Sequence, residues 1–276
     1  MTTFLTQRRP IGVAHRGFGQ GAAENSLAAV QQAVDLGFEC VEIDVRITSD
    51  GHLVVWHDPV LPASAGPELT IADMTFDEVT SIDLPGRAGV APLADFLTTW
   101  PELTFILDVK REECVEPLAR LLTDVGAVER VCIHGSDTDG PRETWVVADD
   151  WMRRMRELLG PELCTTIGSD SQRELGRSGA LAPGETGRFA YGLLSAEHVS
   201  TYPLMNRLTP QVIAAAQAAG IEVIASHRAG LDTLLELGVN AFSTDAPVDL
   251  HERMVEKGLW AETDRRRASQ EGALHA

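Results

Sequence analysis

Residues 26–46 read SLAAVQQAVDLGFECVEIDVR and contain a helix, a stop signal and a strand in succession. After Ser26, apolar residues recur at i, i+3 and i+4 spacing up to Leu36, which predicts a helix with one apolar face. Gly37 offers the left-handed conformation that commonly ends a helix and turns the chain back. The β-rich run that follows predicts a strand, so the stretch is typical of one unit of a parallel α/β fold.

The same alternation recurs along the whole chain. The predicted strands are 11–15, 40–46, 103–109, 130–134, 163–167, 197–202, 221–225 and 240–244. The predicted helices between them are 26–36, 113–125, 144–159, 210–219 and 231–237. Glycines that precede a predicted strand are Gly37, Gly126, Gly160, Gly220 and Gly238. The pattern predicts an α/β fold, a (β/α)₈ TIM barrel with a small insertion after the second strand region. An open doubly wound sheet is the alternative, but no G-x-G-x-x-G follows the first strand.

Length and composition favour a single domain. The chain has 276 residues, of which 44% are hydrophobic, and this is the usual size of one α/β barrel. We expect the barrel domain to span 1–260, with a non-helical insertion at about 58–93 lying over one barrel mouth. Residues 261–276 are expected to form a polar, solvated C-terminal tail.

Charge and cysteine usage exclude several classes of partner. A net charge of −18 and a pI of about 4.8 disfavour binding to nucleic acid or to anionic lipid surfaces. A small phosphate compound in a locally basic pocket is compatible with that charge. The four cysteines are far apart and lack zinc-ligand spacing, so they are interpreted as reduced core residues. The N-terminus has no apolar leader, and no apolar window is long enough to span a membrane, which predicts a soluble, cytoplasmic protein without stable membrane insertion.

Polar residues gather at the ends of the first three predicted barrel strands, where barrel enzymes carry their chemistry. The first strand ends in His15 and Arg16. Glu42 and Asp44 lie two residues apart, so both carboxylates face one side of the second strand. A further acid and base, Asp108 and Lys110, are also two apart. A hard divalent cation with oxygen ligands would offset the buried carboxylates.

His57 follows a predicted hairpin that begins at the D-G turn of residues 50–51. Two histidines beside a metal suit phosphoryl transfer as general base and general acid. Arg16 adds a fork that can hold two phosphate oxygens. Each feature also has a structural interpretation. A single histidine after a strand is more often structural than catalytic. Salt bridges would explain Glu42 and Asp44, and an ion pair with each other would explain Asp108 and Lys110.

The ordered series H-R-G, A-E-N-S, V-E-I-D-V-R-I-T-S-D-G-H-L-V-V-W-H-D and L-D-V-K, from His15 to Lys110, resembles the glycerophosphodiester phosphodiesterase family. A second match is the G-V-N-A-F-S-T-D-A-P of residues 238–247, which is similar to the family's closing G-V-D-G-I-x-T-D-x-P. The resemblance implies a (β/α)₈ fold and hydrolysis of glycerophosphodiesters to glycerol 3-phosphate and an alcohol. It also implies Mg²⁺ or Ca²⁺ as cofactor and a small-molecule phosphodiester as substrate.

The resemblance assigns roles to individual residues. His15 and His57 correspond to the general acid/base pair, and Glu42, Asp44 and Asp108 to the metal ligands. The phosphate contacts correspond to Arg16 and Lys110. The family chemistry is pictured as attack by the neighbouring glycerol hydroxyl to give a cyclic phosphate that water then opens.

Three positions depart from the family pattern. Asp108 stands where the family more often has glutamate, which shortens the ligand by one methylene. The fourth strand ends I-H-G-S at residues 133–136 rather than in S-F, and residues 223–228 read VIASHR where the family has a W-T-V-N-like sequence with a pocket tryptophan. His134 and His227 are therefore candidates to line the mouth.

Other functions fit parts of the pattern. A phospholipase D-like lyase acting on lysophospholipids or sphingomyelin uses a related scaffold, but such relatives are typically secreted and disulfide-bonded. A non-catalytic binding protein on the same barrel and a zinc amidohydrolase, which usually begins H-x-H, are weaker alternatives. The leaving alcohol, the physiological metal and the oligomeric state are left open.

Overall fold

Capped helices alternate with buried strands along the chain. We describe a computed structural model in which residues 10–18, 24–62, 64, 69–140, 144–183, 185–192, 208–226, 230–239 and 241–260 are placed. Ser26 caps α1 (Leu27–Leu36) because its hydroxyl accepts a hydrogen bond from the Ala29 amide at 3.0 Å. Gly37 ends this helix at φ 97°, as its position before a strand predicts.

Parallel strands form the barrel wall in the described part of the chain. In barrel order they are β1 (Ile11–His15), β2 (Cys40–Ile47), β5 (Thr104–Val109), β6 (Val131–Asp137), β8 (Cys164–Thr165), β9 (Phe189–Gly192), β10 (Glu222–Ser226) and β11 (Ala241–Thr244). Each pairs in parallel with the next from β1 to β8 and from β9 to β11, and β11 pairs with β1. A parallel bridge between Thr166 and Phe189 joins β8 to β9, supported by the Arg188 amide bonded to the Thr165 carbonyl at 2.8 Å. These contacts close the eight strands into a barrel.

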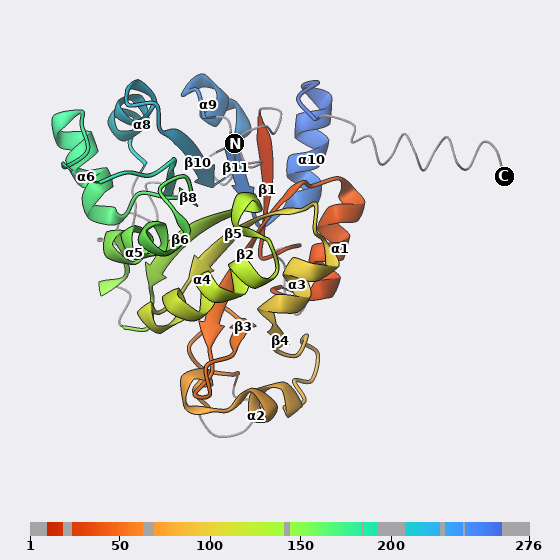
Figure 1. Cartoon of the computed structure of the whole chain (residues 1–276). Coiled ribbons are helices and arrows are strands. Elements are labelled where there is room, and N and C mark those ends of the chain that lie inside the picture. Colours follow the sequence, from red (N-terminus) through yellow and green to blue (C-terminus); the bar gives the residue numbers. More distant parts are fainter. Residues whose placement is uncertain are drawn as a thin grey trace.

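Helices surround this wall, as Figure 1 shows. Outside the insertion, the described helices between successive barrel strands and after the last one are α1, α3 (Leu93–Thr99), α4 (Val115–Asp124), α5 (Asp149–Leu159), α6 (Ser169–Ser178), α8 (Pro210–Ala218), α9 (Leu231–Glu236) and α10 (Pro247–Glu256). Short 3₁₀ turns flank α4 at Glu112–Cys114 and Val128–Arg130, and β7 (Val146–Val147) pairs antiparallel with β6. The sequence did not predict α3, α6 or α10. In α6 the buried residues are mostly polar, with Leu175 the apolar member, so its hydrophobic periodicity is too sparse to reveal the helix.

The barrel interior has an apolar layer and a polar layer, one above the other along the strands. Near the amino ends of the strands the interior is apolar, and its buried residues are Ile11, Val13, Cys40, Ile106, Cys132, Cys164, Phe189, Ile224 and Ala241. Two residues further along β2, Glu42 points to the same inner side as Cys40, and Asp44 follows it. The buried polar groups therefore gather at the carboxyl ends of the strands, where α/β barrels build their sites.

The insertion after β2 contains more regular structure than the sequence predicted. β3 (Leu53–Val55) pairs antiparallel with both β2 and β4 (Ala91–Pro92), and the 3₁₀ turn Ile71–Asp73 and helix α2 (Phe76–Ser81) lie between them. The expectation of a non-helical 58–93 is therefore wrong. Thr75 and Glu78 form a capping box, which supplies hydrogen bonds that so short a helix otherwise lacks. Figure 1 shows this insertion projecting from the barrel, and its own apolar core includes Trp56, Ile71 and Val79.

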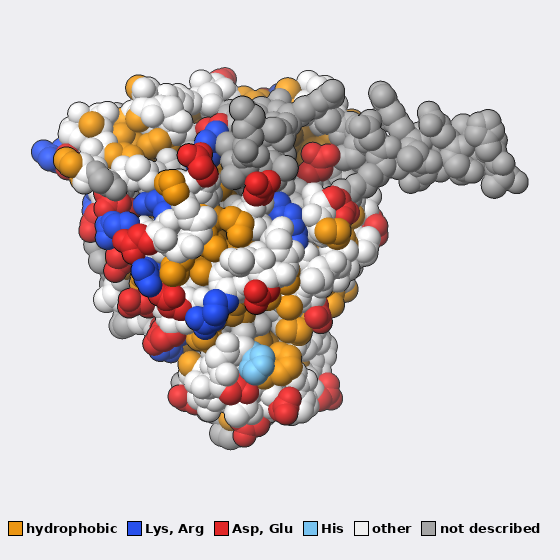
Figure 2. Space-filling model, viewed as in Figure 1, with side chains coloured by type: hydrophobic (Ala, Val, Ile, Leu, Met, Phe, Trp, Pro, Cys, Tyr) orange, Lys and Arg blue, Asp and Glu red, His pale blue; other side chains and the backbone are white. Residues whose placement is uncertain are grey.

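Some sequence expectations fall on residues outside the described ranges, namely the predicted strand 197–202, His227 and the tail 261–276. The barrel strand next to β10 is β9, eight residues before the range that the sequence had indicated. The four cysteines are free and buried, as expected. Of the described helices, none is long and apolar enough to cross a membrane. Figure 2 shows acidic and basic side chains intermingled on the face it presents. Among the surface ion pairs, Arg154 contacts both Glu116 and Glu157.

Candidate active site

The turn after β1 holds the backbone in an uncommon conformation. Arg16 and Asn25 have φ of 54° and 55°, and they are the non-glycine residues with positive φ among those described. Gly17 follows at φ 81°, where an added Cβ would lie 2.9 Å from the backbone of Ala29. Strained residues persist where surrounding contacts hold them in place, and they cluster at functional sites. Here the turn carries His15 and Arg16 over the barrel interior.

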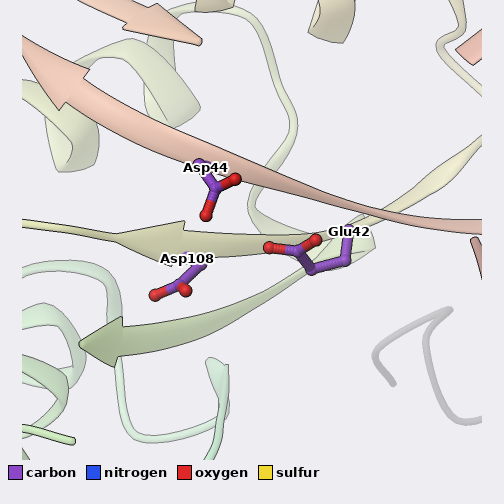
Figure 3. A group of neighbouring side chains, drawn as sticks. All are labelled: Glu42, Asp44 and Asp108. Atoms are coloured by element: carbon purple, nitrogen blue, oxygen red, sulfur yellow. The ribbon is translucent and has the colours of Figure 1, made fainter. Parts of the chain in front are cut away.

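Three carboxylates converge beside this turn from two neighbouring strands. Glu42 and Asp44 lie on β2, and Asp108 lies on β5 directly opposite Asp44 in the register. They are 1%, 1% and 8% exposed, and each offers an oxygen within 4.8 Å of the others. Figure 3 shows the three groups as neighbours, with the carboxylate of Glu42 directed toward Asp44 and Asp108. A set of carboxylate oxygens is the donor chemistry that Mg²⁺ and Ca²⁺ prefer.

Two basic side chains neutralise part of this negative charge. The Nζ of Lys110 lies 2.8 Å from Asp44 Oδ1 and 2.5 Å from Asp108 Oδ2. The Nε of Arg16 lies 3.3 Å from Asp44 Oδ2. Burial would raise the pKa of Asp44, but the charges of Lys110, His57 and Arg16 hold it well below its usual value. Asn25 fixes the same carboxylate, because its Nδ2 donates to Oδ2 at 2.7 Å.

The negative charge of Glu42 is balanced less completely by neighbouring basic groups than that of Asp44. Burial and the neighbouring charge of Asp44 raise the pKa of Glu42 to about 7, although the charge of His15 opposes them. The backbone amide of Arg16 donates to Glu42 Oε2 at 3.0 Å. Three carboxylates thus face two permanently charged bases, and a divalent cation would remove the remaining excess of negative charge. The donor set and its charge therefore fit such an ion.

His15 stands between Glu42 and a residue from the last barrel strand. Its Nε2 lies 3.6 Å from Glu42 Oε2, and its Nδ1 contacts Asp245 Oδ1 in a short hydrogen bond. Burial lowers the pKa of His15, but the charge of Glu42 and the hydrogen bond that Nδ1 donates to Asp245 outweigh this effect, so that the pKa lies above its usual value. Sequence reasoning did not select Asp245. The signal was present, because Asp245 follows β11, the strand that pairs with β1 up to Ala14 and Thr244.

His57 follows β3 at the junction of the barrel and the insertion. Its Nδ1 lies 2.8 Å from Asp58 Oδ1, and its carbonyl accepts a hydrogen bond from Arg46 Nε at 2.8 Å. The amide of Trp56 donates to the Asp44 carbonyl at 3.1 Å, which ties this segment to β2. The effect of His57 on the pKa of Asp44 places it in the same electrostatic cluster. The seven residues to which the family resemblance assigns roles are therefore brought to one end of the barrel.

Comparisons with known proteins bear on this arrangement. The model of the glycerophosphoryl diester phosphodiesterase family matches residues 15–127. A probable glycerophosphodiester phosphodiesterase 2 of Mycobacterium tuberculosis is 28% identical over 93% of this chain and 95% of its own length. The crystal structure of a putative glycerophosphoryl diester phosphodiesterase from Silicibacter pomeroyi superposes with a TM-score of 0.69 at 19% identity, covering 91% of this chain and 95% of that one.

The chain is thus similar to glycerophosphodiester phosphodiesterases over most of its length. A protein named for a different activity matches part of the chain. This lysophospholipase D of Mus musculus is 31% identical over 111 residues, which are 36% of this chain and 35% of that protein. The solved structures of the family support the TIM-barrel fold.

Residues that depart from the family pattern lie next to the carboxylates. The hydroxyl of Ser136, on β6, is 2.6 Å from Asp108 Oδ1 and 3.3 Å from Lys110 Nζ. His134 does not line an open mouth, because it is 2% exposed, bonds Thr166 Oγ1 at 2.8 Å and packs edge-on against Tyr191. Burial lowers the pKa of His134.

A chain of polar contacts also links the site to the insertion. The carboxylate of Glu24 lies 3.2 Å from Arg16 Nη1 and 3.4 Å from Arg87 Nη2. Arg87, from the insertion, lies over the ring of Trp56 at 5.4 Å from its centroid. The insertion thus contacts the turn that carries His15 and Arg16.

Proposed function

We propose that this protein hydrolyses glycerophosphodiesters to glycerol 3-phosphate and an alcohol with the help of a divalent cation. The observation that carries the proposal is the placement of the His15 imidazole 3.6 Å from a buried cluster of three carboxylates at the carboxyl end of the barrel. Water supplies the proton that leaves with the alcohol and the hydroxyl that stays on phosphorus. The match of residues 15–127 to the family model supports this reaction class.

Glu42, Asp44 and Asp108 would hold the cation, which is Mg²⁺ or Ca²⁺. When bound, such an ion neutralises the phosphate oxygens and makes phosphorus more open to attack. Its positive charge would also stabilise the ionised form of Glu42, whose pKa burial and the charge of Asp44 raise to about 7.

His15 and His57 are proposed as the general acid and base. Asp245 accepts a hydrogen bond from His15 Nδ1–H, which leaves Nε2 directed at the Glu42 side of the site. From there Nε2 can take a proton from, or give one to, an oxygen of a phosphodiester bound beside the carboxylates. His57, at the junction with the insertion, would serve the other oxygen of the same ester.

Arg16 and Lys110 are proposed to bind the phosphate. Both guanidinium and ammonium groups already lie beside Asp44, so they bring positive charge to the side of the site where an anion must enter. Lys110 also contacts Asp108, and phosphate binding would require its donors to be shared between the carboxylates and the substrate.

A lysophospholipid is the second candidate substrate, and the 31% match to a lysophospholipase D over part of the chain favours it. Such a substrate carries the same glycerol phosphodiester with one acyl chain added. Product analysis distinguishes the two, because glycerol 3-phosphate forms from the first and an acylated phosphate from the second.

The test uses purified full-length protein with glycerophosphocholine, glycerophosphoethanolamine and lysophosphatidylcholine. Each is assayed with Mg²⁺, with Ca²⁺ and with EDTA, and His15→Ala serves as the inactive control whose folding is checked by circular dichroism. We expect release of glycerol 3-phosphate that needs the metal and is lost in the variant. Equal release in EDTA, or undiminished turnover by folded His15→Ala, would contradict the proposal.

A further inference from the structure

Ser136 occupies a buried position on the inner side of β6. It is 1% exposed and lies two residues after His134, so both side chains point into the barrel. Gly135 between them faces α5, where an added Cβ would lie 3.2 Å from the Trp151 ring. Helix packing at Gly135 therefore fixes which side of the strand Ser136 faces.

The direction of the Ser136 hydrogen bonds follows from its neighbours. Lys110 has an ammonium group that can only donate, and the ionised carboxylate of Asp108 can only accept. The hydroxyl therefore accepts from Lys110 Nζ at 3.3 Å and donates to Asp108 Oδ1 at 2.6 Å. Because Lys110 also contacts Asp108 Oδ2 at 2.5 Å, both oxygens of this carboxylate are held.

Asp108 needs such support more than the other two acids. Its side chain is one methylene shorter than the glutamate of the family pattern, and it is 8% exposed where Glu42 and Asp44 are 1% exposed. Asp44 is held from both sides by Lys110, Arg16 and Asn25, but the contacts of Asp108 come from Lys110 and Ser136.

We propose that Ser136 is a positioning residue for the cation site: its hydroxyl holds the short carboxylate of Asp108 in place toward Glu42 and Asp44. The proposal rests on the proposed function in so far as Asp108 serves as a metal ligand. It accounts for two departures from the family pattern together, the aspartate in the third strand and the serine in the fourth. Hydrogen-bond partners of metal ligands typically change metal affinity by about 10- to 100-fold when removed.

The first test measures cation binding directly, without turnover. Full-length wild type and Ser136→Ala are freed of metal and titrated with Mg²⁺ and with Ca²⁺ by isothermal titration calorimetry. We expect the dissociation constant of Ser136→Ala to be about tenfold higher or more. Ser243→Ala is the matched control, because Ser243 is a buried barrel serine that bonds the Tyr191 hydroxyl at 3.2 Å. Its affinity should equal that of wild type.

The second test asks whether Ser136 supports the short acid in particular. Asp108→Glu and the double variant Ser136→Ala/Asp108→Glu complete a double-mutant cycle. The longer glutamate reaches further by itself, so the loss of the hydroxyl should weaken binding less in the Asp108→Glu background. An equal loss in both backgrounds would overturn the idea of compensation.

The outcomes separate this proposal from the proposed function. If wild type binds cation but hydrolyses none of the esters, the function fails and the calorimetric comparison still decides the role of Ser136. If wild type turns over substrate and Ser136→Ala binds cation as tightly as wild type, the positioning role is refuted and the function stands. If wild type binds neither ion, the positioning role is refuted as well.

Discussion

The contact between His15 and Asp245 makes a quantitative prediction about turnover. In Asp245→Asn the amide oxygen can still accept a hydrogen bond from His15 Nδ1–H, but the negative charge that stabilises a protonated imidazole is gone. In Asp245→Ala both the acceptor and the charge are lost. We therefore expect a graded loss of activity, larger for alanine than for asparagine.

The size of the effect follows from the exposure of the pair. A hydrogen bond to a charged group contributes about 1.5–3 kcal/mol. The side chains of His15 and Asp245 are 25% and 28% exposed, so solvent screening places the expected loss near the lower end, about 1.5–2 kcal/mol. Because about 1.4 kcal/mol corresponds to a factor of ten in rate, kcat/KM of Asp245→Ala should fall roughly 10- to 30-fold, and that of Asp245→Asn by less.

The assay follows glycerol 3-phosphate release from glycerophosphocholine at saturating Mg²⁺, together with the thermal unfolding midpoint. The fall should lie mainly in kcat, because Asp245 acts through His15. Asp249→Asn is the matched control, since Asp249 lies on α10 and pairs with Arg253 at the surface. Turnover by folded Asp245→Ala equal to that of wild type would refute the role of this pair.

Two further predictions concern stability. Gly17→Ala should lower the free energy of unfolding by about 1–3 kcal/mol, because alanine must adopt φ near 81° and its Cβ would lie 2.9 Å from Ala29; urea unfolding checks this, and unchanged stability would show that the turn can relax. His134 has a folded-state pKa below its usual 6.5, so the unfolded chain binds more protons in acid and stability should be lost as pH falls through about 6.5 toward the folded value. His134→Gln should lose less stability than wild type between pH 7.5 and 5.5, when both are measured by urea unfolding in EDTA, and parallel curves would contradict the assignment.

Much of the barrel could be predicted because its signals are local. The helix from Ser26 and its stop at Gly37 depend on residues a few positions apart, and both were confirmed. Insertion helix α2 was missed although Thr75 and Glu78 formed a readable capping signal, since the surrounding prolines and glycines suggested irregular structure. Strand β9 was not predicted because short apolar runs carry little information about which of them enters the sheet.

The candidate site also has features that the sequence predicts and features that only the structure shows. Strand alternation alone places Glu42 and Asp44 on one side of β2, and the family motif points to both histidines. Sequence spacing does not tell how deep a residue lies in a closed barrel or which group faces it across the interior. The positions of Lys110 and Ser136 around Asp108 follow from the register of β5 and β6.

The sequence by itself determined the fold class, the family resemblance and the residue types available for chemistry, because these depend on composition, periodicity and ordered motifs. Only the tertiary structure decided the partners. Closure of the barrel brings Asp245 next to His15 although 230 residues separate them. The same closure buries three carboxylates with two bases. Burial in this shared low-dielectric interior raises the pKa of Glu42, and a bound cation would stabilise its ionised form.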